Sequence, residues 1–194
     1  MKKSVLIFPF MVFGLSTILE AQKVNEGVYL SAKDFTSGTI SYENNQSNQN
    51  YKLYVHDSFK KSTIKIVSGD KTTVLNKDNV FGYRSSDNSF YRFYNKDEYK
   101  IINHSEKILM YSLSTTEGAP RNIHRVTNYY FSKDATSALY PLTKQNLKIA
   151  FANDPKFIEL VNTYFELDAE LYAYDSTQKM YNLNRTYEQY LKDK

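Results

Sequence analysis

The chain has 194 residues, a net charge of +4 and no cysteine, and 41% of its residues are hydrophobic. The lack of cysteine excludes disulfide bonds, cysteine nucleophiles and thiolate metal sites, so stability must come from packing. Basic residues are spread along the sequence without a run of like charges, which argues against a protein that binds nucleic acid.

The first 21 residues have the pattern of a secretory signal peptide. Two lysines precede an apolar run from Val5 to Leu19, and Ala21 is a small residue at the expected cleavage site. The run is short for a membrane-spanning helix, and Pro9 and Gly14 interrupt it. We therefore expect an exported protein (periplasmic, outer-surface or secreted) without a membrane span after cleavage. An N-terminal membrane anchor is the alternative.

Residues 51–113 predict an antiparallel β-meander. The segments between the turns are rich in β-branched and aromatic residues, which favour strands. After Leu113 we expect a long irregular connection and then a last strand at Thr127–Ser132. The polar turn clusters begin eight to ten residues apart: SGDK (68–71), NKDN (76–79), SSDN (85–88), NKDE (95–98) and HSEK (104–107).

Beyond residue 142 the hydrophobic period changes from two to about 3.6, which predicts helices. Thr143 is expected to cap the first helix, Asp154 to cap a second helix that begins at Pro155, and Asp175 to cap a third. The second helix carries an apolar stripe made of Phe157, Leu160, Val161, Tyr164 and Phe165.

These patterns together predict an α+β fold, in which an antiparallel β-meander sheet is followed by a C-terminal helical segment packed on it. No linker rich in proline or glycine divides the chain. After a signal peptide of residues 1–21, we expect a single domain at 22–194, β-rich over 22–135 and helical over 142–192.

Seven of the 24 residues from 79 to 102 are Phe or Tyr. Packing of half-buried strands explains such enrichment, because cross-strand aromatic pairs stabilise a sheet. The alternative is an exposed platform that stacks on sugars or bases. Alternation predicts that Phe81 and Tyr83, with Tyr91 and Phe93, face a core, and that Phe90, Arg92 and Tyr94 lie on a partly solvated face.

No catalytic, metal or cofactor motif is apparent. The sequence lacks a GxSxG elbow and an HExxH pair, and its six glycines form no phosphate-binding loop. His56, His104 and His124 lie in different local contexts. We therefore predict no catalytic residue, no metal site and no cofactor.

Binding residues are expected in two places. The connection at 117–125 carries Arg121, His124 and Arg125 within five residues, which could hold a carboxylate or a phosphate. Arg92 and Tyr94 would contribute if the aromatic strands form a platform. An ordinary solvated loop is the alternative for the first cluster.

Two segments resemble secreted proteins of Bacteroidota-type bacteria whose role is uncharacterised. The first is DNVFGYRSSDNSFYRFYNKDEYKII (78–102), and the second runs from LTKQNLKIAF to NRTYEQYL near the C-terminus. The resemblance implies an exported protein and adds no catalytic residue.

We therefore expect an exported, non-catalytic module of the cell envelope that binds an unknown ligand or envelope protein. A hydrolase or glycan-processing enzyme, with a site assembled from distant segments, is the first alternative. The second is an interaction protein whose helical tail docks on another subunit, which requires the stripe from Phe157 to Phe165 to be exposed.

Overall fold

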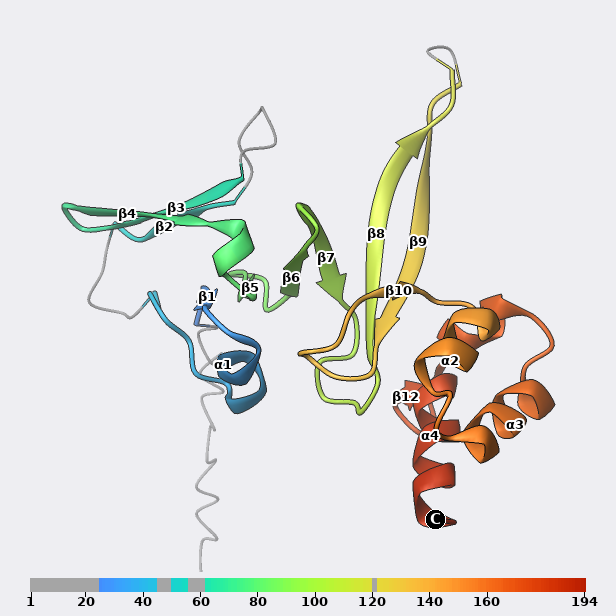
Figure 1. Cartoon of the computed structure of the whole chain (residues 1–194). Coiled ribbons are helices and arrows are strands. Elements are labelled where there is room, and N and C mark those ends of the chain that lie inside the picture. The colour runs from blue at the N-terminus through green and yellow to red at the C-terminus, as the bar shows by residue number, and fades with distance from the viewer. Residues whose placement is uncertain (1–24, 45–49, 56–61, 120–121) are drawn as a thin grey trace, which may run out of the picture.

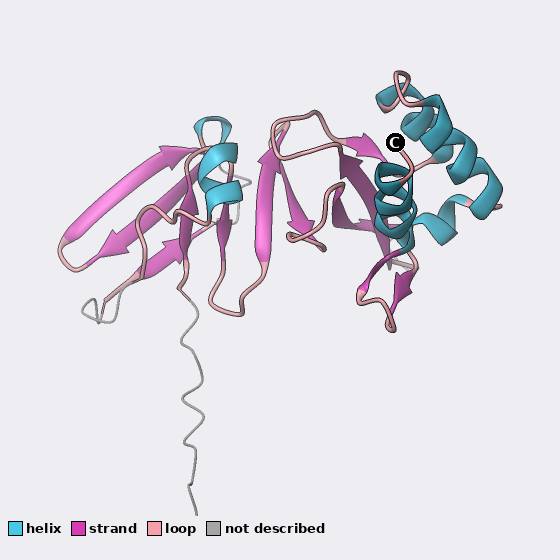
Figure 2. Ribbon diagram, turned by 90° about the horizontal axis from the view of Figure 1, so that it is seen from below, coloured by secondary structure: helices cyan, strands magenta, loops and turns pink. Residues whose placement is uncertain are grey.

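The computed structural model describes residues 25–44, 50–55, 62–119 and 122–194, so the expected signal peptide lies outside the described residues. The fold is α+β, as predicted: a seven-stranded antiparallel sheet in the order β1-β5-β6-β7-β8-β9-β10 is joined by a three-stranded sheet, β2-β3-β4, and a small hairpin, β11-β12. Figures 1 and 2 place the three-stranded sheet at one end and helices α2, α3 and α4 at the other.

The elements fall into two groups along the chain. The first half contains β1 (Gly27–Tyr29), α1 (Ala32–Ser37), β2 (Lys52–Tyr54), β3 (Thr63–Ser68), β4 (Lys71–Asn76), η1 (Lys77–Asn79), β5 (Gly82–Arg84), β6 (Phe90–Tyr94) and β7 (Asp97–Ile101). The second half contains β8 (Leu109–Glu117), β9 (His124–Ser132), β10 (Tyr140–Pro141), α2 (Lys144–Ala150), α3 (Pro155–Tyr164), η2 (Asp168–Tyr172), β11 (Tyr174–Asp175), β12 (Met180–Tyr181) and α4 (Asn182–Lys192).

The predicted meander is present but is divided between two sheets at η1. All five polar clusters lie at turns or, at 76–79, at this 3₁₀ turn. There the side chain of Asn76 accepts a hydrogen bond of 3.0 Å from the N–H of Asp78. The short helix α1 was not predicted; the Ser31 hydroxyl and the Asp34 carboxylate form a capping box at its start.

The prediction of a long irregular connection after Leu113 is wrong. Strands β8 and β9 pair continuously from Leu109↔Ser132 to Glu117↔His124, so the connection spans only 118–123. Figure 1 shows this pair as an arm that extends beyond the neighbouring strands. The β-branched residues between 115 and 127 favour pairing over a loop. Strand β9 is therefore longer than expected, and it is followed by β10, β11 and β12.

The C-terminal helices begin as predicted at two of three positions. The Thr143 hydroxyl caps α2 by accepting from the N–H of Asn146, and α3 begins at Pro155. Asp154, however, makes no side-chain cap; its carboxylate instead accepts from the Tyr190 hydroxyl at 2.5 Å.

The capping box expected at Asp175 is wrong. Its carboxylate accepts from the N–H groups of Thr177 and Gln178 in the turn between β11 and β12, and α4 begins later, at Asn182. An aspartate whose carboxylate accepts from the N–H groups two and three residues later has the same local sequence pattern in a hairpin turn as at the start of a helix. This similarity explains the error.

Buried apolar side chains of the described residues form three clusters. The largest joins α2, α3 and α4 to one face of β8 and β9, with Met110, Phe131 and Phe157 all at 0% exposure. The stripe on α3 is mostly buried within this cluster: Val161 and Phe165 are buried, whereas Tyr164 is 50% exposed. The hypothesis that this stripe docks on another subunit is therefore wrong.

Helix α4 is attached to β8 by a side-chain amide. The Asn184 oxygen accepts from the N–H of Ile108 at 2.8 Å, and its nitrogen donates to the Ile108 carbonyl at 2.9 Å. Asn103 similarly donates to the Ile108 carbonyl and accepts from the N–H of Met110. These amides satisfy the backbone of Ile108 and Met110 at the start of β8, beyond the last residue pair of β7 and β8.

The aromatic strands are mainly core. The Tyr83 ring stacks on the rings of Tyr91 and Phe93, with 4.7 and 5.7 Å between ring centres. These rings belong to the cluster between the two larger sheets. Phe81, predicted on the same face as Tyr83, instead belongs to the neighbouring cluster. Alternation breaks where β5 begins at Gly82: a Cβ on Gly82 would lie 1.9 Å from the Tyr91 carbonyl oxygen, so only glycine fits.

The partly solvated face expected for Arg92 is also wrong, because this side chain is 6% exposed. Its guanidinium donates to the Tyr111 hydroxyl at 3.0 Å, to the Ser132 hydroxyl at 3.4 Å and to the Ser137 carbonyl at 3.0 Å. Within the described chain it forms no ion pair with a carboxylate. Burial raises the pKa of Tyr111 despite the nearby Arg92 charge, so both hydroxyl partners are neutral.

We predict that Arg92→Lys lowers the free energy of unfolding by about 1–3 kcal/mol. One ammonium cannot reproduce the planar guanidinium, which binds hydroxyls on β8 and β9 and the Ser137 carbonyl at the same time. Urea unfolding followed by circular dichroism measures the change. Arg125→Lys, an exposed site, is the control and should change stability by less than about 0.5 kcal/mol. Equal effects of the two substitutions would contradict the structural role of Arg92.

Candidate functional site

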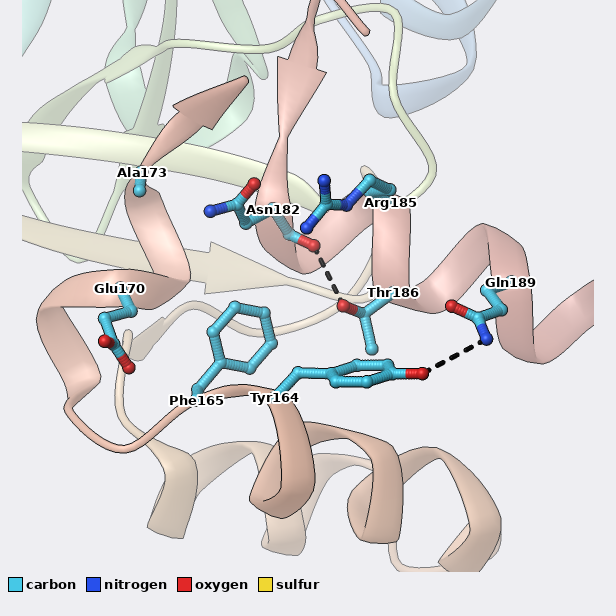
Figure 3. A pocket seen from close by; sticks show the side chains of 8 residues that line it. All are labelled: Tyr164, Phe165, Glu170, Ala173, Asn182, Arg185, Thr186 and Gln189. Atoms are coloured by element: carbon cyan, nitrogen blue, oxygen red, sulfur yellow. Dashed lines mark hydrogen bonds between the residues drawn. The ribbon is translucent and has the colours of Figure 1, made fainter.

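A hollow of about 480 Å³ lies between the C-terminal end of α3, the turn η2 and the exposed side of α4. We call it the C-terminal groove. Figure 3 shows side chains from all three elements around it. Its lining residues are Tyr164, Phe165, Glu170, Ala173, Asn182, Arg185, Thr186 and Gln189.

The packing of α3 on α4 positions the groove. Phe157 and Tyr190 pack together at 5.8 Å between the helices, and the Tyr190 hydroxyl donates to Asp154 at the start of α3. At the other end of α3 the chain turns away, so Phe165 is buried while the preceding Tyr164 stays half exposed. The Phe165 ring therefore closes the floor of the groove, and the Tyr164 ring remains accessible to a ligand.

Glu170 fixes the wall opposite α4. One of its carboxylate oxygens accepts from the N–H groups of Glu166 and Leu167, at 2.6 and 3.0 Å. The ammonium of Lys144 binds the Phe165 carbonyl at 2.9 Å and so holds the same bend from α2. The wall is held by hydrogen bonds to the backbone, which favours a preformed site.

The α4 wall carries planar polar groups. The Gln189 amide donates to the Tyr164 hydroxyl at 3.3 Å, a contact drawn in Figure 3. Arg185 forms an ion pair of 2.8 Å with Asp175 at the rim. The backbone N–H groups of Gln178 and Thr177, together with Arg185, hold the pKa of Asp175 below its usual value. A single bond of this kind leaves other guanidinium donors of Arg185 available.

The groove therefore combines an accessible phenol ring with amide, guanidinium, carboxylate and hydroxyl groups. Such groups can donate to and accept from the hydroxyls of a ligand, while a ring packs against its C–H face. Among the lining residues there is no histidine and no pair of a nucleophile with a base at hydrogen-bond distance. This chemistry suits binding.

The residues predicted from sequence are not brought together. His124 and Arg125 are exposed on β9 near the tip of the arm, and Arg121 lies outside the described residues. Arg92 binds Ser132, seven residues along β9 from Arg125, which is roughly 24 Å of strand. The half-buried Tyr94 ring lies 5.3 Å from the guanidinium of Arg92, and because Arg92 is buried the pair does not form an open platform.

The described histidines and carboxylates show no catalytic arrangement. His104 stacks on Phe90 at 4.2 Å, and burial, followed by the charge of Arg84, lowers its pKa. Burial raises the pKa of Glu106, whose carboxylate accepts from Asn103 and from the N–H of Tyr181, away from the groove. Within the described residues no group of three acidic or histidine side chains could hold a metal ion. His56 lies outside this part of the chain.

The comparisons with known proteins find no match. No family model matches the chain. The search of curated proteins gives no match, and no solved structure matches it. The resemblance to secreted proteins of Bacteroidota-type bacteria thus stays a prediction. None of the described helices is long and apolar enough to cross a bilayer.

Sequence reasoning missed the C-terminal groove because its residues were read as a helix stripe and a helix cap. One signal was present: Tyr164 belongs to the apolar stripe of α3 but lies at its end, beside the buried Phe165. A helix that stops there must leave one of two adjacent rings outside the core. The contribution of η2 depends on a chain reversal that no local pattern indicates.

The bond between Asp154 and Tyr190 should make stability depend on pH. Tyr190, and then Lys194, hold the pKa of Asp154 below the ordinary value of 3.8. A carboxyl group with a lowered folded-state pKa stabilises the fold above its unfolded pKa and loses that contribution as pH falls through the folded value. We predict that Asp154→Asn lowers stability by about 1 kcal/mol at pH 7, and that the difference shrinks below pH 3.8.

Urea titrations of both proteins at a series of pH values measure this difference. Asp193→Asn removes an exposed carboxylate at the same end of α4 and is the control; it should change the free energy of unfolding at neutral pH by less than about 0.5 kcal/mol. A difference that stays constant from neutral to acid pH would show that the ionised carboxylate is not what stabilises the α3–α4 contact.

Proposed function

We propose that this is an exported, non-catalytic module of the cell envelope whose C-terminal groove binds a hydroxyl-rich ligand of the glycan class. The observation that carries the proposal is the half-exposed Tyr164 ring beside the amide of Gln189 and the guanidinium of Arg185. A glycan offers the C–H face and the mixed donors and acceptors that this set of groups can engage.

Export is supported by the N-terminal pattern of two lysines, an apolar run and a small residue at position 21. We expect expression of the full chain in a Gram-negative host to give a processed protein that begins at Gln22. Intact-mass analysis of the periplasmic fraction and medium measures this. An uncleaved chain in the membrane fraction would instead support the N-terminal anchor.

The alternative of a hydrolase or glycan-processing enzyme has less support. Such an enzyme needs carboxylates or a histidine with suitable pKa values inside a cleft. The carboxyl groups of Glu26 and Glu106 have a pKa raised by burial, but neither lines the C-terminal groove. The groove therefore favours a binding function over turnover of a glycan.

The proposal predicts that Tyr164→Ala weakens glycan binding at least tenfold, the equivalent of about 1.4 kcal/mol, because it removes the accessible ring. Titration with chitotetraose and with maltotetraose, followed by amide chemical shifts, gives both the affinity and the location. Tyr54→Ala is the matched control, since Tyr54 is 47% exposed on the separate three-stranded sheet.

Binding that shifts amides of η2 and α4 and is lost only in Tyr164→Ala would support the proposal. If neither oligosaccharide perturbs these amides at millimolar concentration, the glycan assignment is wrong. If both tyrosine variants weaken binding equally, the groove is not the site.

A further inference from the structure

A second hollow, of about 560 Å³, is lined by residues that lie apart from α2, α3 and α4 in the fold. It is formed between η1 and the turn that joins β6 to β7. We call it the η1 hollow. Its lining residues are Lys77, Asp78, Val80, Phe93, Tyr94, Asn95 and Lys96.

The ammonium of Lys77 is held in a defined place. It lies 5.1 Å from the centre of the Phe93 ring, and that ring is 7% exposed at the end of the Tyr91–Tyr83–Phe93 stack. A cation over a ring gains electrostatic attraction but keeps its three N–H donors. Lys77 forms no ion pair with any of the described residues, and its ammonium lines the hollow beside the buried Phe93 ring.

Lys96 is the second lysine that lines the hollow. It follows Asn95 in the tight turn between β6 and β7, where both residues have left-handed backbone angles, with φ of 49° and 69°. It too has no ion-pair partner in the described part of the chain. Asp78 contributes one carboxylate on the η1 side. The lining therefore has a net charge of one positive unit, above a base of buried Val80 and Phe93.

We propose that the η1 hollow is a binding site for a small oxyanion, a carboxylate or a phosphate, held between Lys77 and Lys96. Ammonium groups bind both oxyanions through short charge-assisted hydrogen bonds. Asp78 limits the charge of the site, which favours a small anion over a polyanionic surface. This site is separate from the C-terminal groove and does not depend on the function proposed for it.

Lysine ammonium groups can be observed directly. Reductive methylation with ¹³C-formaldehyde adds labelled methyl groups to each lysine and keeps its positive charge. Titration of the full mature chain with inorganic phosphate, and separately with citrate, should give saturable shifts at Lys77 and Lys96. Comparison of the two titrations distinguishes a phosphate ligand from a carboxylate ligand.

Lys77→Gln and Lys96→Gln should each weaken binding at least tenfold, whereas Asp78→Asn should strengthen it by removing the repulsive carboxylate. Lys96 lies on an exposed turn, so its variant tests the site even if Lys77→Gln disturbs the Phe93 packing. Lys65→Gln is the matched control, because the Lys65 ammonium also lies over a ring, 5.7 Å from the centre of Tyr54, but outside the hollow.

Saturable binding that is lost in the two hollow variants and kept in Lys65→Gln is the expected result. Shifts of equal size at Lys65 and Lys77, or shifts that grow linearly without saturation, would show only general attraction of anions to a basic protein. Either of these results would overturn the proposal.

Discussion

The large sheet depends on a buried positive charge, Arg92, that forms no ion pair among the described residues and is held by neutral hydrogen-bond acceptors. Arg92 extends from β6 to hydroxyls on β8 and β9 and to the carbonyl of residue 137, and its guanidinium also lies 5.2 Å from the Phe81 ring. A buried ion is costly unless its hydrogen bonds are satisfied. Because those bonds come from segments 19 to 45 residues away, they can form only when the strands occupy their final positions.

The two ends of the molecule use different means to attach their elements to this sheet. At the C-terminal end, the amides of Asn103 and Asn184 bond the backbone of Ile108 and Met110 at the start of β8, and α4 packs over β8 and β9. At the other end, stacked rings fill the space between the two larger sheets. The C-terminal groove lies at the end of α3, and the η1 hollow lies beside the buried Phe93 ring. In both places packing stops at a helix end or a buried ring and leaves a recess.

Local patterns predicted the fold class, the turns and two helix starts. Thr143 and Pro155 act through bonds and dihedral angles within one turn of helix, so their roles can be read without knowledge of the fold. The turns at Gly69, Asn88 and Asn95 likewise depend on residues that accept left-handed backbone angles. The same locality explains the error at Asp175, whose bonds to Thr177 and Gln178 fit a hairpin turn as well as a helix cap.

The residues of the buried network and of the proposed sites could not be predicted, because they depend on partners far along the chain. Arg92 was expected at a solvated face, since alternation alone cannot show that Tyr111 and Ser132 lie above it. The sequence predicts a loop at His124 and Arg125, but pairing with β8 places both residues on a strand. The C-terminal groove and the η1 hollow each combine segments that only tertiary packing brings together.

Division of the buried side chains into three clusters has a consequence for motion. Hydrogen exchange in native proteins follows units that open separately, and each unit is as stable as the core it contains. The β2-β3-β4 sheet is held through the cluster around Ile64 and Ile66, whereas the helices belong to the cluster around Phe157. The amides of β2, β3 and β4 can therefore exchange through openings that leave the helical end intact. The outer half of the β8–β9 arm packs on neither of these two clusters. Its amides should therefore exchange before those of the β2-β3-β4 sheet and of the helices.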